Sequence, residues 1–265
     1  MHHDLAYELV GSGPPLLLLH GFTGSRAEWA VLSPMLAAHH ELIMVDLIGH
    51  GESPAPADPA AYPLEGGIAD LLNLLDRLGL AQVDLLGYSM GGRVALQLAC
   101  TAPERIKRLI LLSASPGLAD PAERAARIAS DEALADKIEA RGLHWFVDHW
   151  ASIPLFASQQ TNLSANERAA LRQRRLQGNP SGYANSLRGM GTGRMANLWP
   201  ALPTLNLPTL LITGALDAKF VALGQQMAAA LPQARHVSLP AVGHAVHLEQ
   251  PQACAKLVVG FLREP

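Results

Sequence analysis

The stretch "VDLLGYSMGGRVALQLA", residues 83–99, decides the fold of this 265-residue chain. It begins as an apolar run typical of a buried strand and continues as an amphipathic helix. Between the two lies a Gly-x-Ser-x-Gly pattern centred on Ser89. The glycines allow a sharp backbone turn that leaves the serine exposed, and the N–H groups that open the helix face any developing negative charge. The stretch therefore predicts a strand–turn–helix that presents a reactive serine.

The composition favours a globular enzyme, because 49% of the residues are apolar and 16% are charged. A net charge of −3 provides no basic field for nucleic acid or a membrane surface. The apolar runs are shorter than the roughly 20 residues that span a bilayer. Met1–Asp4 lacks a basic segment followed by an apolar one, so we expect no signal peptide and a cytoplasmic protein. Cys100 and Cys254 lie apart in apolar contexts and are expected to be unpaired.

Buried-strand patterns alternate with helical patterns along most of the chain, which predicts an α/β fold with helices on both faces of a mostly parallel sheet. The expected strands are Leu16–His20, Leu42–Asp46, Val83–Tyr88, Arg108–Ser113, Thr209–Thr213 and Arg235–Leu239, with a more polar antiparallel edge strand over Leu5–Val10. The expected helices are Ile68–Leu78, Gly91–Ala102, Gly224–Ala230 and Gln252–Arg263.

One long region interrupts this alternation. From residue 117 to residue 203 no buried-strand run occurs, and this length is too great for an ordinary loop. We expect a helical cap inserted after the Arg108–Ser113 strand, counted as the sixth strand of the fold. The core would then consist of residues 1–116 and 204–265.

An activated serine needs a base and an acid that orients the base. His244 follows a strand near the C-terminus, and Asp217 lies just beyond another strand. All three residues would lie at the carboxyl ends of parallel strands, where such sheets gather their sites. His247 is a rival base, and Asp217 has an alternative reading as a purely structural residue.

Two loops near the N-terminus bear on the same site. His20-Gly21-Phe22 follows a buried strand, and the backbone N–H groups of Phe22 and Met90 would form an oxyanion hole. Asp46–Ser53 is interpreted as a tight turn that packs beneath the site. With the serine, the acid and the base in this order, the chain resembles the α/β-hydrolase superfamily.

The fold alone does not determine which reaction the protein catalyses. The arginines of the sequence add a constraint on the kind of substrate. Arg93 follows Ser89 by one helical turn and would lie on the same side of the helix. Taken singly, each arginine also fits a solvated or surface-paired residue. Together they suit a substrate with several carboxylates, because guanidinium groups bind carboxylates bidentately. The further arginines of the cap are Arg124, Arg127, Arg172, Arg174 and Arg175.

Longer segments that contain these motifs or lie in the cap are also informative. The segments "GYSMGGRVALQLA", "HWASIPLFAS", "RRLQGNPSGYANSLRGMGTG", "GALDAKF" and "GHAVHLEQP" are similar to the family of 2-succinyl-6-hydroxy-2,4-cyclohexadiene-1-carboxylate (SHCHC) synthases of menaquinone biosynthesis. The similarity runs from about Pro15 to the C-terminus and includes the cap. Some relatives carry an aromatic residue where this chain has Ala151, which leaves the pocket wall open at that point.

The resemblance implies a lyase that eliminates pyruvate from 2-succinyl-5-enolpyruvyl-6-hydroxy-3-cyclohexene-1-carboxylate. It implies that Ser89, Asp217 and His244 form the catalytic triad, with the serine acting as a proton-abstracting base, and that Phe22 and Met90 supply the oxyanion hole. The residues implied to bind substrate are Arg93, Arg127, Arg175, Tyr88, Trp150, Phe156 and Lys219. No cofactor and no metal are expected, and the partner is a small polycarboxylate rather than nucleic acid or membrane.

Two alternatives stay open on the sequence alone. A carboxylesterase or thioesterase would use Ser89 as a covalent nucleophile with the same triad. A binding or signalling protein on this fold would not need the triad at all. The sequence leaves the oligomeric state, and the choice between menaquinone and phylloquinone pathways, undetermined.

Overall fold

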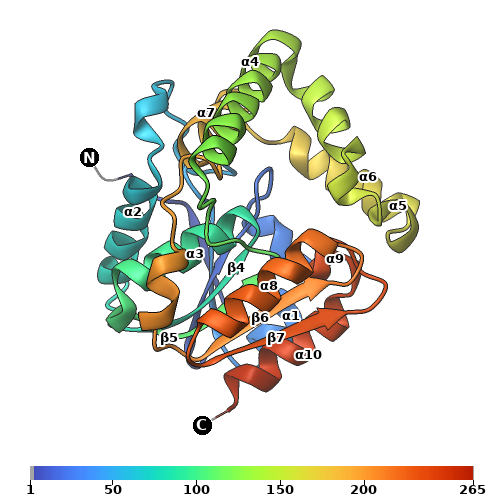
Figure 1. Ribbon diagram of the computed structural model, residues 1–265. Helices are drawn as coiled ribbons and strands as arrows, with labels where there is room; N and C mark the ends of the chain where they lie inside the picture. Colours follow the sequence, from blue (N-terminus) through green and yellow to red (C-terminus); the bar gives the residue numbers. More distant parts are fainter. Residues whose placement is uncertain (1–2, 265) are drawn as a thin grey trace.

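The computed structural model describes residues 3–264 (Figure 1). Met1, His2 and Pro265 lie outside the described residues, and so does the part of the signal-peptide expectation that rests on Met1 and His2. No helix within the described range is long and apolar enough to cross a bilayer.

A seven-stranded sheet in the order β1-β3-β2-β4-β5-β6-β7 organises the core. β1 pairs antiparallel with β3 at one edge, and the remaining neighbours pair in parallel, as predicted. The strands are β1 (Tyr7–Val10), β2 (Pro15–Leu19), β3 (Glu41–Val45), β4 (Val83–Tyr88), β5 (Ile106–Leu112), β6 (Thr209–Gly214) and β7 (Ala234–Leu239). Parallel pairing brings the carboxyl ends of β2, β4, β5, β6 and β7 to one edge of the sheet.

Alternate residues of the central strands pack on opposite faces, because successive side chains of a strand point to opposite sides. Leu17 and Leu85 belong to the core beneath α2, α3 and α8, whereas Leu18 and Leu86 belong to the core beneath α1 and α10. The bounds of these helices are α1 (Ser33–Ala37), α2 (Leu64–Arg77), α3 (Met90–Thr101), α8 (Ala218–Ala230) and α10 (Pro251–Leu262), with the short α9 (Val246–Glu249) before α10. Short 3₁₀ helices cover Arg26–Val31, Pro59–Ala61, Pro103–Arg105, Pro154–Phe156 and Trp199–Thr204.

The cap stands over the carboxyl edge of the sheet, in green and yellow in Figure 1. It consists of α4 (Pro121–Ser152), α5 (Gln159–Asn162), α6 (Ala165–Leu176) and α7 (Pro180–Met190). Its own apolar core includes Ile138, Phe146 and Tyr183. Gly142, at a φ of 81°, interrupts α4 with a kink. The four helices lie between residues 117 and 203, and the division of the chain at those residues stays a prediction.

One detail of the predicted order needs correction. The strand before the cap, β5, is the fifth strand along the described chain and not the sixth. The reason is that one antiparallel strand, β1, precedes the parallel strands in residues 3–264.

Candidate active site

Ser89 occupies the turn between β4 and α3 with a φ of 50° and a ψ of −107°, a strained backbone for a residue with a side chain. The two glycines of the motif are required by close approach. A Cβ on Gly87 would lie 2.4 Å from the carbonyl oxygen of Gly91, and one on Gly91 would lie 2.2 Å from that of Leu19. The Ser89 N–H donates to the carbonyl of Leu112 on β5 at 2.9 Å. The sequence thus folds locally into the predicted strand–turn–helix, and the serine is held rigidly at its apex.

A hydrogen-bonded chain joins Ser89, His244 and Asp217. His244 Nε2 lies 2.9 Å from Ser89 Oγ, and Nδ1 lies 2.7 Å from Asp217 Oδ2. Because a carboxylate only accepts, Nδ1 carries the proton and Nε2 is left to accept from the serine hydroxyl. The loops of the acid and the base are tied together, since the Leu216 N–H donates to the carbonyl of Val242 at 2.8 Å. The arrangement suits removal of the serine proton by a neutral imidazole.

His247, the rival base, lies in a separate buried cluster. Its Nε2 is 3.5 Å from Glu28 Oε1, and its ring packs against Trp29 and Tyr88. No hydrogen bond joins it to Ser89 in the described part of the chain. The geometry therefore favours His244 as the base.

Hydrogen bonds around His20 and Gly21 fix the loop before Phe22, and they leave the Phe22 N–H without a protein acceptor within residues 3–264. The Gly21 carbonyl accepts from the Gly24 N–H at 3.0 Å and lies 2.8 Å from His20 Nδ1. His20 Nε2 accepts from the Leu47 N–H at 3.0 Å, so Nδ1 is the protonated nitrogen and donates to Gly21. In a trans peptide the next N–H points away from that carbonyl, and this N–H belongs to Phe22.

Met90 provides the second candidate donor, because it begins α3 and its N–H has no acceptor within the helix. Neither the Phe22 nor the Met90 N–H donates to a protein acceptor within residues 3–264. Both residues line the same cavity as Ser89 and His244. The geometry is compatible with the predicted oxyanion hole.

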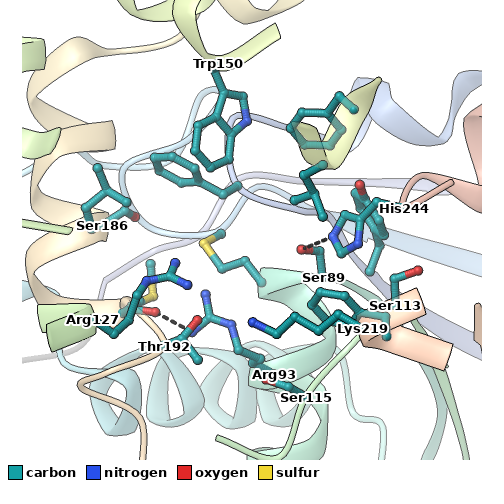
Figure 2. A pocket seen from close by; sticks show the side chains of 18 residues that line it. Ser89, Arg93, Ser113, Ser115, Arg127, Trp150, Ser186, Thr192, Lys219 and His244 are labelled. Atoms are coloured by element: carbon teal, nitrogen blue, oxygen red, sulfur yellow. Dashed lines mark hydrogen bonds between the residues drawn. The ribbon is translucent and has the colours of Figure 1, made fainter. Parts of the chain in front are cut away.

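This cavity has a volume of about 180 Å³ and lies between the cap and the sheet edge (Figure 2). Cations enter it from both layers: Arg93 from α3, Arg127 from α4 and Lys219 from α8. The lining residues are Phe22, Tyr88, Ser89, Met90, Arg93, Ser113, Ser115, Arg127, Trp150, Leu155, Phe156, Ser186, Leu187, Met190, Thr192, Lys219, Phe220 and His244.

Arg93 is the most unusual of these cations, because its side chain is buried without a carboxylate partner within ion-pair distance among the described residues. Its Nη1 donates to the carbonyl of Met190, at the end of α7, at 2.6 Å. Burial and the nearby charge of Arg127 lower the pKa of Arg93 to about 10, although Asp131 acts in the opposite direction. A buried cation that lacks a counter-charge is a natural binding partner for an anionic ligand.

Arg127 differs from Arg93 because it already has an acidic partner. Its Nε lies 2.8 and 2.9 Å from the two carboxylate oxygens of Asp131, one helical turn along α4. Burial raises the pKa of Asp131, and Arg127 and Arg93 oppose that rise. Lys219 is exposed at the cavity, and no ion pair involves it within residues 3–264.

The structure does not bring every predicted binding residue to the cavity. Arg175 is buried, but its guanidinium lies 5.3 Å from the ring centre of Phe156 and is not among the lining groups. Burial lowers the pKa of Arg175. Arg172 faces away and pairs with Asp148 at 2.6 Å, and neither Arg124 nor Arg174 reaches the cavity.

The aromatic residues Tyr88, Trp150 and Phe156 line the walls of the cavity, and their predicted role in substrate binding stays a prediction. The indole nitrogen of Trp150 is buried without a hydrogen-bond partner within residues 3–264. Ala151 is not among the residues that line this cavity.

Sequence reasoning missed several polar lining residues. Ser113 is fully buried with a φ of 47°, and its hydroxyl has no hydrogen-bond partner among the described residues. Ser113 directly follows β5. Active-site residues gather at the carboxyl ends of parallel strands, and this rule could have identified Ser113 from the sequence. The buried hydroxyl of Ser186 is likewise unpaired in the part of the chain that the structure describes, but Ser186 lies on α7, where only the folded cap reveals its direction.

Comparisons with known proteins agree with this architecture. A family described as alpha/beta hydrolase fold matches residues 14–251. A Bacillus subtilis (strain 168) protein, provisionally named 2-succinyl-6-hydroxy-2,4-cyclohexadiene-1-carboxylate synthase, is 44% identical over 97% of this chain and 94% of its own. The synthase of that name from Serratia proteamaculans (strain 568) is 34% identical over 95% of this chain and 94% of its own. The structure of MenH from S. aureus superposes with a TM-score of 0.93 at 34% identity and covers 99% of this chain and 98% of that one.

Proposed function

The chain belongs to the SHCHC synthase family of the α/β-hydrolase fold, and we propose that it eliminates pyruvate from 2-succinyl-5-enolpyruvyl-6-hydroxy-3-cyclohexene-1-carboxylate. The observation that carries the proposal is the buried, carboxylate-free guanidinium of Arg93 in the same cavity as the Ser89–His244 pair. A neutral ester would leave this charge without a partner, whereas the proposed substrate carries three carboxylates. Cytoplasmic location and a small polycarboxylate partner are part of the proposal.

The first chemical step is removal of a proton from the ring carbon next to the succinyl carbonyl. Ser89 Oγ takes this proton while His244 Nε2, 2.9 Å away, accepts the hydroxyl proton of the serine. Asp217 stabilises the imidazolium that forms, through its hydrogen bond to Nδ1 at 2.7 Å. Negative charge moves onto the succinyl carbonyl oxygen, where the N–H groups of Phe22 and Met90 would donate to it.

The second step breaks the bond between the ring and the enolpyruvyl oxygen. The electron pair of the broken C–H bond forms a ring double bond, the existing double bond shifts by one position, and the C–O bond breaks. The enolpyruvate that leaves takes a proton from His244 and becomes pyruvate, so the base returns to its neutral form. The ring retains a conjugated diene, and no water and no covalent enzyme intermediate are required.

The cations act on this reaction by holding the substrate carboxylates and balancing the new charge. Arg93 gains most from an incoming carboxylate, because its charge is buried without a carboxylate partner among the described residues. Arg127 contributes less than a free guanidinium would, because Asp131 already pairs with its Nε. We propose Lys219 as an outer contact, and Tyr88, Trp150 and Phe156 as walls around the ring.

The direct test is to incubate the protein with the enolpyruvyl substrate and to measure pyruvate and diene absorbance together. The proposal expects both products in equal amounts. Turnover of neutral esters with an accumulating acyl-enzyme, and no pyruvate, would instead favour the carboxylesterase or thioesterase alternative.

A further inference from the structure

Glu28, in the 3₁₀ helix Arg26–Val31, places a buried carboxylate against the loop that carries Phe22. Its Oε2 accepts from the Gly21 N–H at 2.9 Å. A Cβ on Gly24 would lie 2.5 Å from the same oxygen, so the missing side chain at that position lets the carboxylate approach the loop. The start of the loop is therefore tied to the helix at its end through one side chain.

Both peptide groups of Gly21 are held by hydrogen bonds. The N–H donates to Glu28, and the carbonyl accepts from the Gly24 N–H at 3.0 Å and from His20 Nδ1 at 2.8 Å. A glycine has no side chain that packing could hold, so these hydrogen bonds are what restricts its φ and ψ. The carbonyl of Gly21 and the N–H of Phe22 belong to one planar peptide group. A fixed Gly21 therefore fixes the direction in which the Phe22 N–H points.

The other carboxylate oxygen of Glu28 faces a histidine of α9. Oε1 lies 3.5 Å from His247 Nε2, and the His247 ring packs against Trp29 and Tyr88 with ring centres 5.2 and 4.3 Å away. Burial raises the pKa of Glu28, but His247 and the Gly21 N–H lower it below the usual value. The side chain is therefore an ionised acceptor with contacts on two sides, which hold it in place against the loop.

The charge of Glu28 by itself works against an oxyanion hole. A carboxylate near the Phe22 N–H disfavours a second negative charge on a substrate oxygen, because like charges repel. The hydrogen bond to Gly21 acts in the opposite direction, because it holds a donor where the new charge develops. The position of the carboxylate and its charge thus make opposite contributions, and suitable substitutions can separate them.

We propose that Glu28 is a positioning residue that holds Gly21 so that the Phe22 N–H points at the oxygen that becomes negative in the reaction. Glu28 acts through its acceptor oxygen and not through its charge, and it is not among the residues that line the cavity. The kinetic part of this inference rests on the proposed pyruvate elimination and its oxyanion hole. The orientation of the Phe22 N–H can be measured without substrate.

Two conservative substitutions separate position from charge. Glu28→Gln removes the charge but keeps an oxygen of the same reach, which accepts from the Gly21 N–H while the amide NH₂ donates to His247 Nε2. Glu28→Asp keeps the charge but shortens the side chain by one methylene group, which withdraws the oxygen from Gly21. We expect Glu28→Gln to keep kcat within about 3-fold of wild type. We expect Glu28→Asp to lower kcat roughly 10- to 100-fold with KM within about 2-fold, because a donor to the developing charge is displaced.

Asp70 provides a matched control on α2. Its buried carboxylate also accepts from a backbone N–H, that of His3 at 2.7 Å, but it does not line the cavity. Asp70→Ala removes this acceptor, so the variant should be less stable than wild type while its kcat stays within about 2-fold. Equal losses of kcat in Glu28→Asp and Asp70→Ala would indicate a general effect of weakened folding and would overturn the inference.

A measurement without substrate reports on the donor itself. The Phe22 amide gives a resonance in the NMR spectrum of isotope-labelled protein, and its position depends on the orientation and surroundings of that N–H. We expect this resonance to shift or broaden in Glu28→Asp and to stay near its wild-type position in Glu28→Gln and Asp70→Ala.

Two results would contradict the positioning role independently of each other. One is an unchanged Phe22 resonance in Glu28→Asp. The other is a loss of more than about 10-fold in the kcat of Glu28→Gln, which decides the question even if Glu28→Asp does not fold. If the wild-type protein released no pyruvate, the proposed function would fail, while the Phe22 resonance would still decide whether Glu28 orients this N–H.

Discussion

Replacement of Arg93 by methionine should separate stability from function. Arg93 is buried, and its Nη1 donates to the Met190 carbonyl at 2.6 Å, the one hydrogen bond of its side chain within residues 3–264. Burial lowers its pKa to about 10 from the usual 12.5. The difference corresponds to roughly 3 kcal/mol by which the folded protein disfavours the charged side chain at neutral pH. Arg93→Met removes this penalty and leaves the Met190 carbonyl without a partner, which costs about 1–3 kcal/mol.

The two effects on stability oppose each other and are similar in size. We therefore expect the free energy of unfolding of Arg93→Met to change by less than about 2 kcal/mol. Function should change far more, because a substrate carboxylate loses a charged partner in a dry site. A loss of about 2–4 kcal/mol corresponds to a decrease in kcat/KM of roughly 30- to 1000-fold for pyruvate release.

Arg108 provides the matched control, because it is also buried but lies outside the cavity and next to a carboxylate. Its Nη1 is 3.7 Å from Asp84 Oδ1, and its Nη2 donates to the carbonyl of Glu264. Arg108→Met should lower the free energy of unfolding in urea and leave kcat/KM unchanged. If Arg93→Met instead lost more than about 3 kcal/mol of stability and kept its kcat/KM, Arg93 would be a structural residue and the reasoning would fail.

Three further outcomes follow from the same site. Ser89→Ala should abolish pyruvate release and leave the unfolding midpoint nearly unchanged, and a near-normal rate would show that the base is elsewhere. Lys219→Met should lower kcat/KM about 3- to 10-fold at low salt and less at high salt, because this exposed charge is screened; equal losses at both salt levels would argue against a charge contact. Burial alone would raise the pKa of Glu28, but His247 and the Gly21 N–H lower it below 4.5. Wild type should therefore be more stable than Glu28→Gln above about pH 4.5, and it should lose this advantage as the pH falls through the lower pKa of Glu28 in the folded protein. Urea unfolding measures the difference in free energy of unfolding between the two proteins. A difference that stays constant from pH 7 to 3 would contradict this linkage.

The sequence was most informative where local geometry and topology act together. The apolar run before Ser89 requires a buried strand, the glycines permit the turn, and a parallel sheet then brings the loops of Asp217 and His244 to the same edge. These relations depend on short segments and on the order of the strands, so they can be read without a structure.

The cap was harder to predict, because the direction of a helical side chain depends on how the helix docks. Arg127 and Arg175 both fit a cluster of cations in the sequence, but α4 directs one into the cavity and α6 places the other over the ring of Phe156. Ser186 reaches the cavity because α7 packs against α4, and no spacing in the chain encodes that contact.

The reaction at Ser89 is tested most directly with substrate that carries deuterium on the ring carbon next to the succinyl carbonyl. If Ser89 removes that proton, kcat/KM for pyruvate release should show a primary isotope effect, and the mass of the intact protein should stay unchanged during turnover. An isotope effect of one, together with a mass increase located on Ser89, would contradict the account and identify the serine as a covalent nucleophile.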